Sequence, residues 1–112
     1  MSNVTLKGQM LPAEKADRWI TELEAAPGSF VWVNEDGEPA APGEEDRLLF
    51  SAPNGGGIGS CPIRSGGPKQ RPVEWDWDGN REEPTLTPSV WFNKDQPGDW
   101  HGWLRQGRWE GC

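Results

Sequence analysis

Apolar and polar side chains alternate most regularly in the second half of the chain. Over residues 73–77, Val73, Trp75 and Trp77 alternate with acidic residues, which places the three apolar side chains on one face of a predicted strand. The pattern predicts a meander of short antiparallel strands separated by turns. Other runs rich in β-branched and aromatic residues predict strands over residues 30–33, 48–50 and 89–92, and a hairpin over residues 100–109 that turns at Gln106-Gly107.

One segment near the N-terminus has the period of a helix instead. Four apolar residues recur at the spacing of a single helix face: Ala16, Trp19, Ile20 and Leu23. Pro27 and the glycine after it then end the segment. We therefore predict a helix over about residues 12–26. For residues 1–112 as a single domain we predict an α+β fold that is mostly β, with a small twisted antiparallel sheet, this one N-terminal amphipathic helix, and long loops rich in glycine and proline, such as residues 52–72.

Eight tryptophans among 112 residues change the expectation for the core, since only 33% of the residues are hydrophobic. Each buried tryptophan removes on the order of 200 Å² from water, so a few of them can hold a small core together. Tryptophan is rarely buried completely, and so small a core cannot hide all of them. We therefore expect two or three tryptophans in the C-terminal third to line a groove or an interface, with neighbouring arginines beside them.

The charge balance and the absence of long apolar runs exclude some classes of partner. The formal net charge is −7, which disfavours direct binding to a nucleic-acid backbone because that affinity comes mainly from lysine and arginine. No apolar run approaches 18 residues and no secretory leader begins the chain, so we expect no membrane span. The expected location is the cytoplasm of a host cell, with Cys61 and Cys112 reduced.

His101 is the only histidine and lies in the tryptophan-rich stretch. Its imidazole could act as a general base or bind a ligand, and a hydrogen-bonded structural histidine is the alternative. No serine or cysteine stands at a recognisable spacing from it, although the members of a catalytic triad need not be close in sequence. Thr85, Thr87 and Ser89 lie on a predicted extended segment, where their hydroxyls could bond a ligand or a neighbouring loop.

Residues 48–110 contain a motif that resembles a known family. The motif runs Trp75-x-Trp-Asp-Gly-Asn-x-x-x-Pro-Thr-Leu-Thr-Pro-Ser-Val90 and continues as Trp100-His-Gly-Trp-Leu-x-x-Gly-x-Trp109. It is similar to small phage and prophage proteins of unknown function, many of which bear the name ammonia monooxygenase. A single histidine cannot provide the copper site that this name requires.

Members of the wider family look like zinc-binding β domains. The resemblance implies zinc ligands at positions that are Ala52, Gly55 and Gly98 in this chain, which retains only His101. We therefore expect no cofactor, and zinc is the alternative. Thiolate and imidazole ligands suit zinc, so the candidate metal ligands are Cys61, His101 and Cys112.

These observations lead us to predict a small non-enzymatic accessory protein of a phage or prophage that binds, and interferes with, a host defence or regulatory protein. Two alternatives stay open: sequestration of a small anionic ligand such as a nucleotide in a pocket lined by tryptophan and arginine, and a metal-dependent hydrolase. Exposed tryptophans also favour a homodimer. The residues predicted to bind the ligand or partner are Trp77, Arg81, Trp91, Trp100, His101, Trp103, Arg105 and Trp109.

Overall fold

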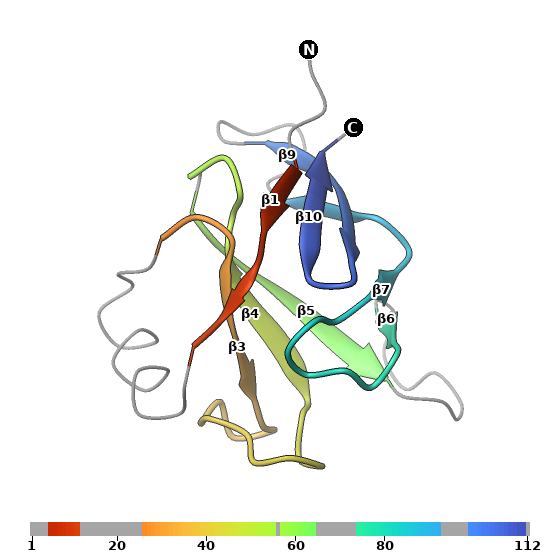
Figure 1. Ribbon diagram of the computed structural model, residues 1–112. Coiled ribbons are helices and arrows are strands. Elements are labelled where there is room, and N and C mark those ends of the chain that lie inside the picture. The colour runs from red at the N-terminus through yellow and green to blue at the C-terminus, as the bar shows by residue number, and fades with distance from the viewer. Residues whose placement is uncertain (1–4, 12–25, 56, 65–73, 93–98, 112) are drawn as a thin grey trace.

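The computed structural model describes residues 5–11, 26–55, 57–64, 74–92 and 99–111, which form an all-β structure of two sheets (Figure 1). The predicted α+β class is wrong for this part of the chain, because no helix occurs in it. That class depended on the segment 12–26, of which residues 12–25 lie outside the described residues. The strands in chain order are β1 (Thr5–Lys7), β2 (Gln9–Met10), β3 (Ser29–Val33), β4 (Arg47–Ser51), β5 (Ile58–Arg64), β6 (Trp75–Trp77), β7 (Leu86–Thr87), β8 (Val90–Phe92), β9 (Trp100–Arg105) and β10 (Arg108–Gly111).

The strands form two sheets of different size. A four-stranded sheet has the order β1-β10-β9-β8, and a six-stranded sheet has the order β2-β3-β4-β5-β6-β7. The predicted antiparallel meander is wrong at two pairings, since β2 pairs parallel with β3 and β5 pairs parallel with β6. A parallel pair needs a connection much longer than a tight turn, and the chain supplies one between the two members of each pair.

Strand β5 lies within the segment whose composition predicts a loop rich in glycine and proline. It pairs with β4 over five residues and buries Cys61 and Ile63. Glycine is required at position 59, because a Cβ there would collide with the ring of Phe50 and would lie 2.8 Å from the ring of Phe92. The glycine therefore makes room for two core aromatic rings, and the composition of the segment concealed a strand.

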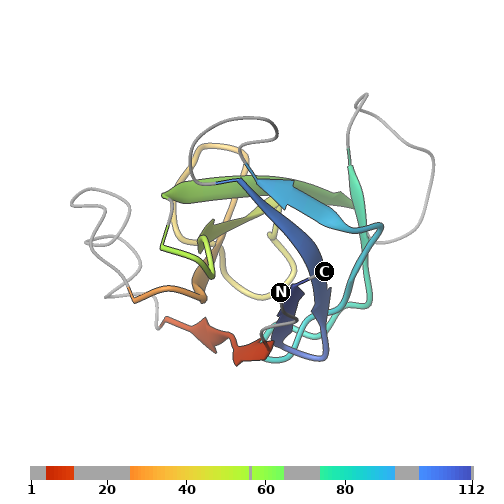
Figure 2. The same ribbon diagram turned by 90° about the horizontal axis from the view of Figure 1, so that it is seen from above.

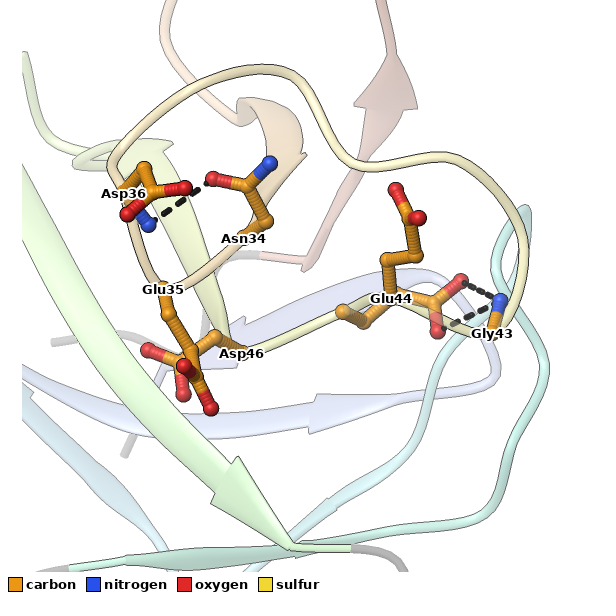
Figure 3. A pocket seen from close by; sticks show the side chains of 7 residues that line it. Asn34, Glu35, Asp36, Gly43, Glu44 and Asp46 are labelled. Atoms are coloured by element: carbon orange, nitrogen blue, oxygen red, sulfur yellow. Dashed lines mark hydrogen bonds between the residues drawn. The ribbon is translucent and has the colours of Figure 1, made fainter.

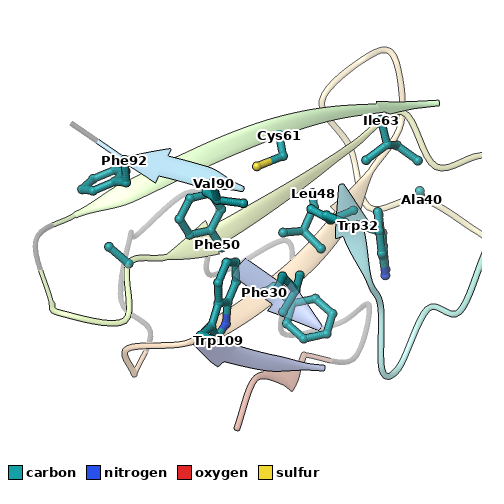
Figure 4. Packing of buried hydrophobic residues seen from close by; sticks show 13 residues of the cluster. Phe30, Trp32, Ala40, Leu48, Phe50, Cys61, Ile63, Val90, Phe92 and Trp109 are labelled. Atoms are coloured by element: carbon teal, nitrogen blue, oxygen red, sulfur yellow. The ribbon is translucent and has the colours of Figure 1, made fainter. Parts of the chain in front are cut away.

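One cluster of buried side chains joins the two sheets (Figure 4). The six-stranded sheet contributes Phe30 and Phe50, and the four-stranded sheet contributes Val90, Leu104 and Trp109. Seen from above, strands of both sheets surround this interior (Figure 2). The core therefore lies between the sheets, and the opposite surface of the four-stranded sheet faces outward.

The predicted hairpin over residues 100–109 is confirmed as β9 and β10. Gln106 and Gly107 form its two-residue turn with φ of 49° and 76°. Positive φ at both positions is the backbone geometry that matches the twist of a tight hairpin. The described residues include no helix long and apolar enough to cross a membrane.

Candidate functional site

The outward surface of β8 and β9 carries a group of polar and aromatic side chains, which we call the outer face. The antiparallel register places Trp91 directly opposite His101 and Val90 opposite Gly102. Since side chains alternate along a strand, the residues between the buried positions point outward. The outer face consists of Ser89, which immediately precedes β8, together with Trp91, His101, Trp103 and Arg105.

Ser89 and His101 form a direct hydrogen bond on the outer face. The distance between Ser89 Oγ and His101 Nε2 is 2.9 Å, and the bond lies in partly buried surroundings. In the tautomer with an unprotonated Nε2, the serine hydroxyl donates to the imidazole. The backbone at Ser89 is also held, because the indole N–H of Trp75 donates to the Ser89 carbonyl at 3.1 Å. A serine held against an imidazole in this way has the geometry of a nucleophile and its general base.

Two indole rings flank the imidazole of His101. The Trp91 ring is stacked on it, with ring centroids 4.6 Å apart and planes inclined by 17°. The Trp103 ring is tilted by 31° at 6.2 Å, and the guanidinium of Arg105 lies 4.8 Å from the centre of the Trp103 ring. The indole N–H of Trp91 donates to Asp99 Oδ1 at 2.8 Å. The imidazole of His101 therefore has aromatic neighbours on the outer face.

The structure brings together four of the eight residues that the sequence predicted to bind a ligand: Trp91, His101, Trp103 and Arg105. The other four lie elsewhere. Trp77 packs on Trp32, with ring centroids 4.4 Å apart. Arg81 forms an ion pair with Glu45 and donates to the carbonyl of Ala40 at 3.0 Å.

Trp100 and Trp109 pack against each other, edge to face, with ring centroids 5.6 Å apart. Trp109 is completely buried and donates from its indole N–H to the carbonyl of Gly28 at 3.0 Å. These two residues therefore belong to the hydrophobic packing of the four-stranded sheet.

The candidate zinc ligands are not assembled in the described part of the chain. Cys61 is buried in β5, and burial raises the pKa of its thiol far above the usual range. A zinc-binding cysteine must be a thiolate, which this environment strongly disfavours. Cys112 lies outside the described residues. Within the ranges that the structure describes, no three histidine, cysteine or acidic residues lie close enough together to hold a metal.

An acidic pocket lies in the loop between β3 and β4, strands of the other sheet (Figure 3). It has a volume of about 400 Å³ and is lined by residues 34–36 and 43–46. Its polar groups hold the loop together. Asn34 Oδ1 accepts hydrogen bonds from the backbone N–H groups of Asp36 and Glu38 at 2.9 and 3.0 Å. Asp46 pairs with Arg47 at 3.1 Å.

Ser89 is the site residue that the sequence does not identify. Its hydroxyl is one of three on a predicted extended segment, where each could bond a ligand or a loop. The usable signal is that two predicted strand segments, residues 89–92 and the start of the hairpin at residue 100, follow each other closely along the chain. This order favours antiparallel pairing, but neither the register nor the hydrogen bond of 2.9 Å follows from it.

Comparison with known proteins identifies the family. A family model described as "Bacterial ubiquitination-like system serine protease (BubE)" matches residues 15–112. Neither a curated protein nor a solved structure matches the chain.

The family match overturns the predicted non-enzymatic phage binding protein and gives no support to its two alternatives, because the family is described as a serine protease. That prediction rested on the acidic charge and on the resemblance to phage proteins, and neither of these reveals the serine that is hydrogen-bonded to His101. The resemblance to phage proteins stays a prediction. The match covers well over half of the chain, which therefore belongs to the BubE family of bacterial ubiquitination-like system serine proteases.

Proposed function

We propose that this protein is a serine protease in which Ser89 is the nucleophile and His101 is the general base. The hydrogen bond between Ser89 Oγ and His101 Nε2 supports the proposal most directly, since 2.9 Å is within the range needed for proton transfer. Membership of a family described as a serine protease supports it independently.

The two residues can perform both halves of a peptidase reaction. In the first half, the Ser89 oxygen attacks the carbonyl carbon of the scissile bond while Nε2 of His101 takes the serine proton. The resulting imidazolium gives this proton to the leaving amine, and an acyl-enzyme remains. In the second half, His101 takes a proton from water, the water oxygen attacks the ester, and the proton returns to Ser89 as the acid leaves.

The proposed substrate is a protein joined through an amide bond to a ubiquitin-like modifier, or the precursor of such a modifier. The family description names a ubiquitination-like system, in which a protease would cut at the modifier. The position of the site suits a protein substrate, because the outer face includes Trp91, which is 45% exposed, beside the serine–histidine pair. We propose a cytoplasmic location, where the reduced thiol of Cys61 would also persist.

A fluorophosphonate probe tests the proposal before any substrate has been identified. Such a probe bonds its phosphorus to an activated serine oxygen and loses fluoride, while the general base takes the serine proton. We expect wild-type protein to be labelled at Ser89, and Ser89→Ala and His101→Ala to reduce the labelling rate by about 10⁴-fold or more. Mass spectrometry of the labelled peptide identifies the modified residue.

Ser60→Ala is the matched control, because Ser60 is an exposed serine on β5. Its labelling rate and thermal stability should equal those of the wild type. Wild-type protein that is not labelled, or Ser89→Ala protein labelled at the wild-type rate, would reject the proposed function.

A further inference from the structure

The exposure of Trp91 requires an explanation. Its side chain is 45% exposed, and it is the one large hydrophobic residue in the described ranges that is so open to solvent. An indole at this position on an outward-facing strand contributes little to the core. Its ring contacts the imidazole of His101 instead, as its cross-strand neighbour in β9. The stack on His101 therefore accounts for this indole better than core packing does.

The geometry of this contact is suited to holding the imidazole in one plane. The two rings are nearly parallel at 17° with centroids 4.6 Å apart, so a rotation of the histidine ring about its side-chain bond would collide with the indole. The same ring plane directs Nε2 toward Ser89 Oγ at 2.9 Å. Trp91 is itself fixed, because its N–H donates to Asp99 Oδ1 at 2.8 Å.

Of the two indole rings near His101, that of Trp91 is better placed to stabilise a positive charge on the imidazole. The Trp91 ring faces the imidazole and is bonded to the Asp99 carboxylate, so it presents electron-rich aromatic surface to the imidazolium that forms when His101 takes the serine proton. The Trp103 ring is tilted and farther from the imidazole, and it already faces the guanidinium of Arg105. Glu110 offsets part of that charge through an ion pair with Arg105 at 3.1 Å.

We propose that Trp91, oriented by Asp99, is a positioning residue that holds the His101 ring in the plane from which it can take the proton of Ser89. This inference rests on the proposed function. It adds to the serine–histidine pair a chain of three contacts, from Asp99 to Trp91 to His101 to Ser89, in which Trp91 acts on the proton transfer through the imidazole of His101.

The first test compares labelling kinetics with a fluorophosphonate probe in four proteins: wild type, Trp91→Leu, Trp91→Phe and Trp77→Leu. We expect Trp91→Leu to lower the maximal inactivation rate by about tenfold or more and to leave the half-saturating probe concentration unchanged. Phenylalanine can still stack, so Trp91→Phe should restore the rate to within about threefold of the wild type. Trp77→Leu removes an indole that packs on Trp32, away from the serine–histidine pair, so it should change the rate by less than about threefold.

A second test observes the contact directly and needs no activity. His101 is the only histidine, so its imidazole proton signals in an NMR spectrum are unambiguous. A stacked indole shifts these signals upfield, and the shift should disappear in Trp91→Leu and persist in Trp77→Leu. A double-mutant cycle then asks whether Asp99 acts through Trp91: Asp99→Ala should slow labelling in the wild type and have no further effect in Trp91→Leu.

The outcomes separate this inference from the proposed function. If wild-type protein is labelled at Ser89 but Trp91→Leu is labelled equally fast, or if Trp77→Leu loses as much rate as Trp91→Leu, the positioning role is rejected and the protease assignment stands. If wild-type protein is not labelled, the protease assignment fails. Imidazole signals that do not move in Trp91→Leu would reject the stack itself.

Discussion

The two faces of the four-stranded sheet use the same strands for different purposes. On the inner face, Val90 and Leu104 are almost completely buried in the core. On the outer face, Trp91 and His101 alternate with buried positions along β8 and β9 and form the candidate site. Because neighbouring residues of a strand point to opposite faces, substitutions only one residue apart should affect either stability or chemistry.

Two tryptophans make the contrast concrete. Trp109 and Trp91 lie in the same sheet, and each donates a hydrogen bond from its indole N–H. Trp109 is completely buried and donates to a backbone carbonyl of Gly28, whereas Trp91 is 45% exposed and donates to the Asp99 side chain. Their chemistry as side chains is the same, and only the face on which each lies distinguishes a core residue from a site residue.

The largest loss of stability is expected from a substitution on the inner face. Trp109→Ala removes a fully buried indole and leaves a cavity beside Phe50, so it should lower the free energy of unfolding by about 3–5 kcal/mol, measured by urea denaturation. Trp109→Phe should cost less because it retains a ring. Among molecules that remain folded, labelling of Ser89 should be unchanged. A loss below about 1 kcal/mol would show that the two faces do not differ in this way.

A substitution at Gly102 should affect both stability and reactivity, because this buried residue lies between two residues of the outer face. Gly102 is buried between His101 and Trp103, and a Cβ there would collide with the Glu110 carbonyl of β10 and lie 2.8 Å from the Trp100 ring. We expect Gly102→Ala to cost about 2 kcal/mol or more in unfolding free energy. Since β9 must shift, labelling of Ser89 should also slow.

Gly37→Ala is the control for this prediction. Gly37 has a φ of 80° and open space around its Cα, so alanine there should cost about 1 kcal/mol through backbone conformation alone. Its labelling rate should match that of the wild type. If Gly102→Ala proved as stable and as reactive as the wild type, the close packing of β9 against β10 would be refuted.

The smallest effect is expected at the rim of the outer face. Arg105 is 54% exposed and pairs with Glu110, which is 34% exposed, so Arg105→Ala should change the unfolding free energy by less than about 1 kcal/mol. It should change the labelling rate by less than about twofold, with a difference that diminishes at high salt. A tenfold loss of labelling would instead place Arg105 within the reactive part of the site.

The sequence predicts the hairpin of β9 and β10 because the Gln106-Gly107 turn and the flanking alternation are local signals. It does not predict β5, since Gly59 is selected by two aromatic rings that come from β4 and β8. His101 could be singled out as the one histidine. Its partner Ser89 depends on the pairing of β8 with β9, which no local pattern specifies. The same limit applies to Trp109, whose burial depends on contacts with distant parts of the chain.

The pairing of β1 with β10 has a consequence for how the protein is made. Residues 5–7 leave the ribosome early, yet their partners in the sheet, residues 108–110, are translated much later. A contact between such distant parts forms slowly and only after synthesis has passed both of them. The four-stranded sheet is therefore complete only once residues 108–110 have been made, and until then β1 has no partner strand in that sheet.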